Sequence, residues 1–317
     1  MIRKKKILIT GSNGLLGQKL VKTFKALNDF EVIATSKGSN RINDQQGYKY
    51  ESLDITDKQQ VEFIFKKHMP DTVINTAAMT NVDACETDKE GCFVLNVTAV
   101  KNMVEVLEDL SVQLKAASIE KPHFIHLSTD FIFDGKNGPY EESDIPNPLS
   151  YYGWSKLESE KIVKESSLRW CIIRTIIVYG IADNLSRSNI VLWAKDALEQ
   201  KKQISIVDDQ FRSPTLAEDL AQGCLLTVIK EATGIFHISG KDFMSILDLT
   251  YRVADFFQLD KSTVTSTKSS GLNQPAKRPP KTGFIIDKAR KELGYEPHSF
   301  EEGLAILNEQ LKLQVAG

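Results

Sequence analysis

Hydrophobic and polar positions follow two alternating patterns through the first half of the chain. Short apolar runs with the length of buried strands lie at residues 5–10, 31–35, 72–75, 123–128 and 169–174. Between these runs, apolar side chains recur every three or four positions, as on one face of a helix, at residues 20–27, 57–68, 96–110 and 151–165. Strands that alternate with helices predict helical crossovers between parallel strands. We therefore expect an α/β fold with a doubly wound (Rossmann) parallel sheet.

The pattern loosens after residue 180. Helices are predicted at residues 189–199, 216–230, 245–257 and 300–313, with one short strand at residues 234–238. Residues 260–283 are rich in Ser, Thr, Lys and Pro, which predicts a long loop that is either a functional lid or disordered. We expect residues 1–180 to form the Rossmann domain, with residues 215–237 returning to it. Residues 181–317 would form mainly a smaller α/β lobe that binds the substrate.

Charge and composition narrow the classes of partner. The formal net charge of −2 gives no electrostatic reason to expect binding to nucleic acid or to an anionic membrane. No apolar run approaches the roughly 20 residues that span a bilayer. The four cysteines lack the spacing of metal ligands, so we expect reduced thiols in a cytoplasmic protein and no metal site.

A glycine-rich turn directly follows the first predicted strand. It reads Gly11-Ser12-Asn13-Gly14-Leu15-Leu16-Gly17 and leads into a predicted helix. In this context glycines let the backbone approach a pyrophosphate, and the helix N-terminus offers free N–H groups to the anion. The alternative is a turn used only for packing. The cofactor-binding residues expected here are Gly11, Asn13, Gly14, Leu15, Leu16 and Gly17.

A tyrosine and a lysine four residues apart form the second candidate site. Tyr152 and Lys156 would share one face of the predicted helix, and Thr129 ends the strand that precedes it. A neighbouring ammonium group favours phenolate and would lower the pKa of Tyr152, so that the tyrosine could exchange a proton with a carbonyl oxygen. The alternative is an ordinary pair on a solvated helix face.

Several strings together carry a resemblance to a known family. They are Gly11–Gly17, Leu53-Asp54-Ile55-Thr56, Asn75-Thr76-Ala77-Ala78, Ser128-Thr129-Asp130-Phe131-Ile132-Phe133-Asp134-Gly135, Tyr152–Lys156, Arg174-Thr175 and Arg212-Ser213-Pro214-Thr215. Over nearly its whole length the chain resembles the extended short-chain dehydrogenase/reductases, and within them the dTDP-4-dehydrorhamnose reductase family. It is also similar to the regulatory β subunit of methionine adenosyltransferase, which acts as a partner-binding protein.

The resemblance implies a cytoplasmic enzyme of dTDP-rhamnose biosynthesis. NADPH would reduce the C4 ketone of a nucleotide-linked 4-keto-6-deoxy sugar. Tyr152 would protonate the developing alkoxide and Thr129 would hydrogen-bond the same oxygen. Lys156 would bind the nicotinamide ribose and lower the pKa of Tyr152. The cofactor supplies the hydride chemistry, and the protein supplies position and electrostatics.

The choice of cofactor follows from the end of the second predicted strand. NAD enzymes usually place an acid there for the ribose 2′-hydroxyl, whereas this chain has Ser36 and Lys37, which suit a 2′-phosphate. NADP(H) is therefore favoured, with NAD(H) and a merely exposed lysine as the alternatives. Asp54 and Ile55 would lie beside the adenine of the cofactor, unless Asp54 only caps a helix. The resemblance adds Ala77, Ala78 and Met79 to the cofactor site.

Two departures from related enzymes bear on the substrate. Phe131 follows Asp130 where related dehydratases carry a glutamate, so dehydration is not expected. Ile176 and Ile177 follow Arg174-Thr175 where the reductases carry a tryptophan, which leaves the identity of the sugar open.

The remaining candidates concern substrate contacts. Thr129 and Asp130 would bind the substrate, and Arg212 and Arg278 would contact its diphosphate, because guanidinium groups bind phosphate oxygens in a fork. Either arginine could instead be a surface residue without a ligand. His126 lies on an apolar strand and is expected in the core.

Two other functions stay open. The chain could be a non-catalytic NADP-binding partner protein, like the methionine adenosyltransferase β subunit, or a sugar-nucleotide epimerase. The oligomeric state is also open, with a homodimer among the alternatives.

Overall fold

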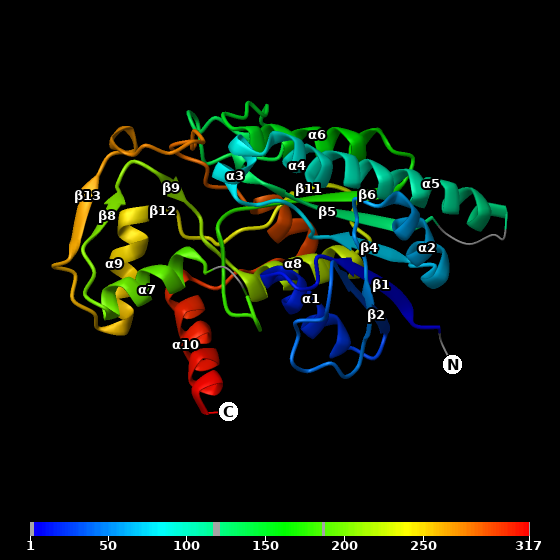
Figure 1. The fold of residues 1–317 in the computed structure, drawn as a ribbon, viewed down its shortest axis with the longest axis horizontal. Coiled ribbons are helices and arrows are strands. Elements are labelled where there is room, and N and C mark those ends of the chain that lie inside the picture. Colours follow the sequence, from blue (N-terminus) through cyan, green and yellow to red (C-terminus); the bar gives the residue numbers. More distant parts are fainter. Residues whose placement is uncertain (1–2, 117–120, 186–187, 317) are drawn as a thin grey trace.

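The computed structural model describes residues 3–116, 121–185 and 188–316. Within these residues the main sheet has seven strands, all parallel, in the order β11-β6-β5-β4-β1-β2-β3 (Figure 1). The strands are β1 (Lys5–Thr10), β2 (Phe30–Ser36), β3 (Lys49–Ser52), β4 (Thr72–Asn75), β5 (His123–Thr129), β6 (Arg169–Thr175) and β11 (Gly234–His237). This order, together with helices on both faces, confirms the predicted doubly wound α/β fold.

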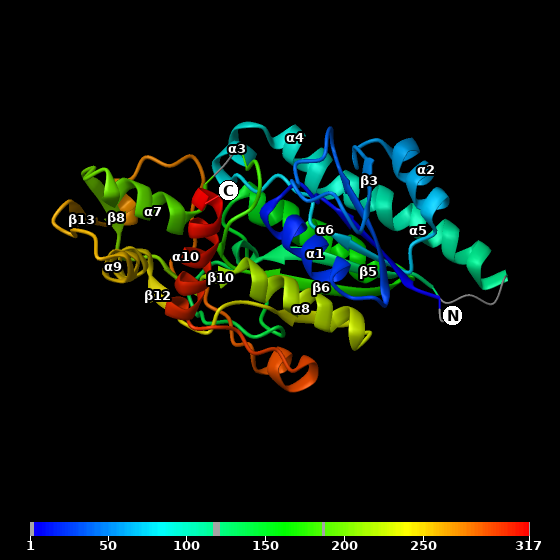
Figure 2. The same cartoon turned by 90° about the horizontal axis from the view of Figure 1, so that it is seen from below.

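Helices cover both faces of this sheet (Figure 2). On one face lie α1 (Leu15–Lys25) and α8 (Ala217–Ile229), and on the other lie α2 (Lys58–His68), α5 (Ala99–Ala116) and α6 (Tyr151–Glu165). Because side chains alternate along a strand, Ile7 and Ile9 join the core under α1, whereas Leu8 joins the core under α2 and α5. Burial on both faces explains why these strands read as continuous apolar runs.

The order of the strands reverses at β1, which pairs with β2 on one side and with β4 on the other. Parallel strands all end at the same edge of the sheet. The turn after β1, the segment after β4 and the end of β5 therefore come together there. Crevices at such a reversal point are where doubly wound sheets bind their ligands.

A smaller lobe packs beside the carboxyl edge of the sheet, on the left of Figure 1. Its helices are α7 (Ile190–Glu199), α9 (Ile246–Phe257) and α10 (Phe300–Ala316). Its short strands pair as β7 (Val178–Tyr179) with β10 (Thr215–Leu216), β9 (Phe211–Arg212) with β12 (Met244–Ser245), and β8 (Ile204–Val207) with β13 (Val264–Thr267). A separate apolar cluster, which includes Tyr179, Val191, Leu249 and Phe300, forms its core.

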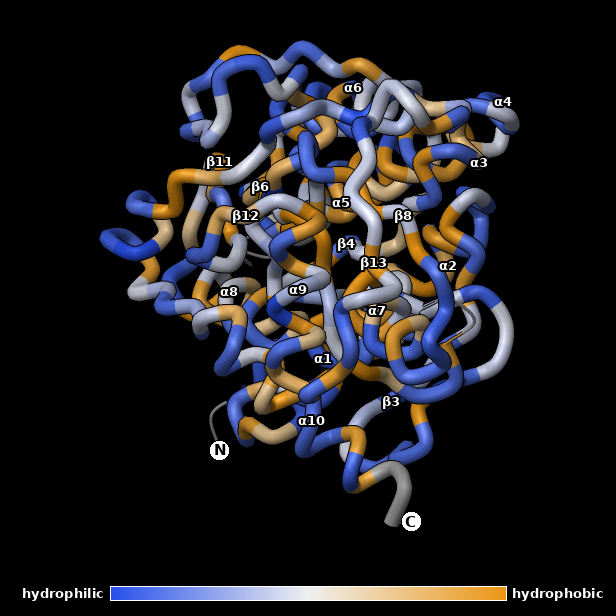
Figure 3. The backbone as a smooth tube through the Cα atoms, turned by 90° about the vertical axis from the view of Figure 1, so that its left-hand side faces the viewer, coloured by the Kyte–Doolittle hydropathy of each residue, from blue (hydrophilic) through white to orange (hydrophobic). Residues whose placement is uncertain are grey.

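Hydrophobic stretches run through the strands and the buried sides of the helices, whereas hydrophilic stretches gather in the outer loops (Figure 3). Among the helices of the described residues, none combines the length and the hydrophobicity that a membrane span requires.

The sequence missed several short elements. β3 is a half-exposed edge strand, and α3 (Val82–Thr87) and α4 (Lys89–Phe93) are too short to show a helical period. The helix predicted from residue 96 begins instead as a π-helix, η1 (Val94–Thr98), which continues into α5. The long loop predicted for residues 260–283 is partly wrong, because β13 lies within it and pairs with β8.

The division into two domains stays a prediction. β11 and α8 nevertheless lie in the main sheet and its helical layer, as expected for residues 215–237.

One buried ion pair fastens α6 to the sheet. The guanidinium group of Arg174 on β6 donates two hydrogen bonds to the carboxylate of Glu160 on α6, at 2.9 and 2.8 Å. Arg174 is 1% exposed and Glu160 is 0% exposed. Removing one partner of such a pair leaves a charge in the interior without compensation.

We predict that Glu160→Gln lowers the free energy of unfolding by about 3–5 kcal/mol, because Arg174 stays buried without a counter-charge. Urea unfolding of both proteins measures the loss. Glu158→Gln is the matched control: its carboxylate pairs with Lys161 on the exposed side of the same helix, and we expect a change of at most about 1 kcal/mol. Equal losses in the two variants would contradict a dominant role for the buried pair.

Candidate active site

The glycine turn after β1 is shaped to receive a phosphate group. Gly11 has a φ of +69°, and a Cβ there would lie 2.8 Å from the backbone nitrogen of Ala77, so only glycine fits. Gly14 is the N-cap of α1 and has no side-chain capping bond, which leaves the first N–H groups of the helix to a ligand. The buried hydroxyl of Ser12, in the same turn, has no hydrogen-bond partner. The turn therefore suits the pyrophosphate of a dinucleotide.

Asn13 joins this turn to the loop after β2. Its side-chain amide donates to the carbonyl of Ser39 at 2.8 Å, and its oxygen accepts the backbone N–H of Arg41 at 2.9 Å. Its side chain thus positions the second loop, a role that the sequence analysis did not give it.

Lys37 lies in that second loop, where it forms an ion pair of 2.7 Å with Asp54. Its side chain is 81% exposed and could still turn toward a 2′-phosphate. Asp54 also accepts from the backbone and the hydroxyl of Thr56. The N-cap of α2 is Asp57, so the alternative that Asp54 caps this helix is wrong.

The segment after β4 is held by a residue that the sequence analysis missed. Asn96, 1% exposed in the π-helix η1, exchanges two hydrogen bonds with the backbone of Met79, at 2.8 and 3.1 Å. Its amide also donates to Ser155 on α6 at 3.0 Å. Asn96 thereby ties the predicted cofactor segment of Ala77, Ala78 and Met79 to α6, the helix of Tyr152 and Lys156. The one signal in the sequence was an asparagine in the midst of apolar helical positions.

Thr129 and Tyr152 meet at the carboxyl edge of the sheet. Thr129 ends β5, and Tyr152 lies in the first turn of α6, whose N-cap is Ser150. The hydroxyl of Thr129 lies close enough to the phenol of Tyr152 to influence its ionisation. The close approach depends on Gly153, since a Cβ there would lie 2.1 Å from the carbonyl oxygen of Phe131. Two residues on different elements thus come close together at this edge.

The structure changes the prediction for the proton affinity of Tyr152. Burial raises the pKa of Tyr152 above its usual value; the nearby hydroxyl of Thr129 opposes this rise, and the charge of Asp130 adds to it. The prediction of a lowered pKa is therefore wrong, because the loss of water around the phenol outweighs the favourable interactions. A raised pKa keeps the phenol protonated at neutral pH.

Lys156 is buried one turn further along α6, with 3% exposure. Burial lowers the pKa of Lys156 to about 8, although Glu160 and Cys92 favour its charged form. Its Nζ lies 3.2 Å from Nε2 of His126, which is 0% exposed on β5. His126 is a core residue as predicted, yet it directly contacts a candidate catalytic group.

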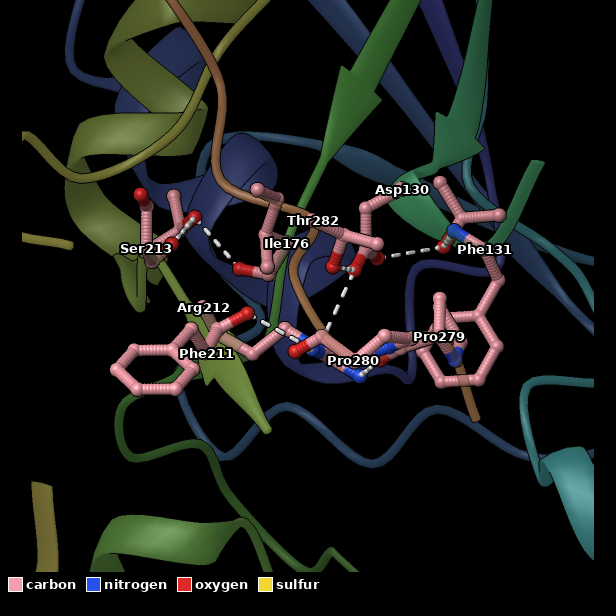
Figure 4. Close-up of polar contacts among 11 residues, drawn as sticks. Asp130, Phe131, Ile176, Phe211, Arg212, Ser213, Pro279, Pro280 and Thr282 are labelled. Carbon is pink, nitrogen blue, oxygen red and sulfur yellow. Dashed lines mark hydrogen bonds and ion pairs between the residues drawn. The ribbon is translucent and has the colours of Figure 1, made fainter. Parts of the chain in front are cut away.

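Asp130 and Arg212 lie in a buried polar cluster where the smaller lobe meets the sheet (Figure 4). Asp130 accepts from Thr129 at 3.1 Å and from Thr282, and Nε of Arg212 lies 3.5 Å from its carboxylate. Burial raises the pKa of Asp130, and Arg212 opposes that rise most strongly. The remaining guanidinium nitrogens donate to the carbonyls of Phe211, Pro279 and Pro280.

Arg212 and Arg278 already have protein partners. Arg212 is 2% exposed and fixes the backbone around Pro279 and Pro280. Arg278 forms a two-pronged ion pair with Asp83 of α3, at 3.1 and 2.7 Å. A diphosphate contact by either arginine stays a prediction. For Arg212 it would require breaking buried hydrogen bonds, so Arg278 is the better placed of the two.

Comparisons with known proteins agree with this geometry. A dTDP-4-dehydrorhamnose reductase from Clostridium acetobutylicum is 30% identical and superposes with a TM-score of 0.83, over 97% of this chain and 99% of that one. A dTDP-4-dehydrorhamnose reductase from Bacillus anthracis, solved in complex with NADP, is 25% identical with a TM-score of 0.81, over 97% of this chain and all of the other. Methionine adenosyltransferase 2 subunit beta from Bos taurus is 30% identical over 86% of this chain and 79% of its own length.

The family model described as the RmlD substrate binding domain matches residues 5–313, which span both the main sheet and the smaller lobe. The predicted family resemblance is confirmed, and the chain belongs to the RmlD substrate binding domain family.

Proposed function

We propose that the protein is an NAD(P)-dependent oxidoreductase that uses NADPH to reduce the C4 ketone of a nucleotide-linked 4-keto-6-deoxy sugar. The observation that carries the proposal is the placement of Thr129 at the end of β5 near Tyr152 in the first turn of α6, beside a glycine turn that suits a pyrophosphate. Family membership and the likeness to dTDP-4-dehydrorhamnose reductases support it. The bound NADP of the Bacillus anthracis reductase supports the cofactor.

The residues of this chain would divide the work as follows. The bound nicotinamide supplies the hydride. Tyr152, which stays protonated because burial raises its pKa, donates its proton to the oxygen that develops negative charge. Thr129 orients that oxygen through its hydroxyl. Lys156 in its charged form would donate to the ribose hydroxyls of the cofactor and so help to orient it.

The geometry gives no support to dehydration. Phe131 follows Asp130, and its ring packs edge-on against Tyr152 with the centroids 5.8 Å apart. A phenyl group at this position cannot assist the loss of water from a sugar. Ile176 is fully buried, so it offers no indole-like surface to a sugar ring. The sugar and its nucleotide are therefore the least constrained part of the proposal.

A second candidate function is a cofactor-binding partner protein. It is favoured by the similarity to methionine adenosyltransferase 2 subunit beta, which equals in identity the similarity to the Clostridium acetobutylicum reductase. Such a protein could bind the cofactor at the glycine turn without converting any substrate. An epimerase, which would oxidise and reduce the same carbon, is the third candidate and rests on no separate observation.

We predict that Tyr152→Phe lowers the rate of NADPH oxidation with dTDP-4-dehydrorhamnose by about 10²–10⁴-fold, because the proton donor is lost. Its affinity for NADPH should change little. Absorbance of the reduced nicotinamide follows turnover, and titration calorimetry follows binding. The matched control is Tyr151→Phe, which removes the neighbouring hydroxyl and should leave the rate within about twofold.

The outcomes separate the candidates. Turnover in the wild type that Tyr152→Phe abolishes supports the reductase. NADPH binding without turnover of this or other 4-keto sugars would favour the partner protein. Inversion of the configuration at one carbon of the sugar, without net NADPH consumption, would favour the epimerase.

A further prediction concerns the binding of the nucleotide sugar. If Arg278 leaves Asp83 to bind the diphosphate, Arg278→Met should raise KM for the substrate about tenfold or more, while kcat changes little. Arg290→Met removes a half-exposed arginine elsewhere and serves as the control. An unchanged KM in Arg278→Met would show that its pair with Asp83 is purely structural.

A further inference from the structure

A row of buried polar side chains crosses the centre of the sheet and ends at Lys156. Thr10 on β1, Asn75 on β4 and His126 on β5 are direct register neighbours on adjacent strands. They are 0%, 1% and 0% exposed. Polar groups at such positions are costly unless each one is hydrogen-bonded, so the direction of every hydrogen bond in the row is constrained.

The first two hydrogen bonds fix the protonation of the imidazole. The hydroxyl of Thr10 donates to Oδ1 of Asn75 at 2.6 Å. Asn75 therefore presents its Nδ2, which can only donate, to Nδ1 of His126 at 3.1 Å. Nδ1 must then be the acceptor, and the proton of the neutral ring lies on Nε2.

The opposite side of the ring faces α6. Nε2 of His126 lies 3.0 Å from the hydroxyl oxygen of Ser159 and 3.2 Å from Nζ of Lys156. Ser159 donates its own hydrogen to the carbonyl of Lys156 at 2.7 Å, so its oxygen is free to accept from the ring. An Nε2–H can also donate to a lysine amine, but it cannot accept from an ammonium group.

We propose that His126 is a positioning residue for Lys156: Thr10 and Asn75 hold its ring as the Nε2–H tautomer, which favours the neutral amine over the ammonium form. The inference rests on the proposed function only for its consequence at the cofactor. The ribose hydroxyls and phosphates of NADPH favour the ammonium form, so binding of NADPH would draw one proton from solvent onto Lys156.

The other groups around Lys156 each favour or oppose its charged form. Glu160 on the same helix and Cys92 on α4 favour the ammonium form, whereas burial opposes it. Tyr152 lies one turn earlier on α6 and is protonated at neutral pH. Burial, together with the charge of Lys156, lowers the pKa of His126 well below its usual value, which keeps the ring neutral.

The sign of the pH dependence follows from these shifts. The pKa of Lys156 is lowered to about 8, so the ammonium form predominates below that pH and the amine above it. Affinity for NADPH should therefore fall as the pH rises above about 8, and proton uptake on binding should be about half a proton at that pH and larger above it. At about two pH units lower, the lysine is already charged and uptake by this group should vanish.

The first experiment determines the tautomer without any cofactor. Nitrogen-15 NMR of the histidine side chains, with the signals of His126 assigned from His126→Asn, distinguishes a protonated from a bare ring nitrogen. We expect a bare Nδ1 and a protonated Nε2 at neutral pH. The reverse pattern, or a doubly protonated ring, would overturn the proposal.

A pair of matched variants tests the cause. Thr10→Val removes the hydroxyl that orients Asn75, so the amide can turn, the ring proton can move to Nδ1, and Nε2 can accept from the ammonium group. The pH above which the affinity for NADPH decreases should then be higher than in the unmodified protein. Thr35→Val removes an equally buried hydroxyl from the register neighbour of Thr10 on β2, where it donates only to the carbonyl of Ile9. It should leave both the tautomer and this pH unchanged.

Calorimetry in two buffers of different ionisation enthalpy measures the proton uptake in the unmodified protein. Uptake near pH 8 that Lys156→Met abolishes supports the proposal, and binding without uptake overturns it. Equal effects of Thr10→Val and Thr35→Val would show a merely structural role and also overturn it. If NADPH does not bind at all, the proposed function fails, whereas the tautomer measurement still decides the role of His126.

Discussion

The parallel register of β1, β4 and β5 is the constraint on which the site depends. It sets Thr10, Asn75 and His126 side by side in the middle of the sheet, and it brings the turns that follow these strands to one edge. Because one face of each strand must meet α1 and the other must meet α2, α5 or α6, a shift by one residue would exchange the two cores. The glycine turn after β1 and Thr129 at the end of β5 are therefore positioned by the packing of apolar side chains on both faces.

Burial determines the chemistry of the groups at this edge. It raises the pKa of Tyr152 and lowers that of Lys156, so each is held closer to its neutral form than in water. Both effects come from the exclusion of water around α6, which packs on β5 and, at Tyr152, against Cys85 of α3 and Cys92 of α4. Gly153 permits that close packing, and the ion pair between Glu160 and Arg174 fastens the same helix to β6. The helix that carries Tyr152 and Lys156 is thus held against both β5 and β6.

The smaller lobe is attached to the sheet through polar contacts as well as through its own apolar core. Arg212 contacts Asp130 at the end of β5 and the carbonyls of Pro279 and Pro280 in the chain that crosses the site. Thr282 donates to the same aspartate. Asp130, the residue after Thr129, therefore also helps to hold the lobe in place. This dual role explains why an arginine that the sequence suggested for phosphate binding is enclosed by protein.

Features that depend on near neighbours along the chain could be predicted from the sequence. The apolar runs defined the strands and longer helices, the glycine turn followed β1, and Tyr152 and Lys156 shared one helix, because these patterns arise within a few residues. Which distant groups meet depends instead on how the chain folds. Asn96 holds Met79 and Ser155, Arg212 meets Asp130, and His126 faces Lys156 across segments far apart in the chain. Burial, which reversed the expected pKa shift of Tyr152, is likewise a property of the assembled fold, because it depends on how completely the packed elements exclude water.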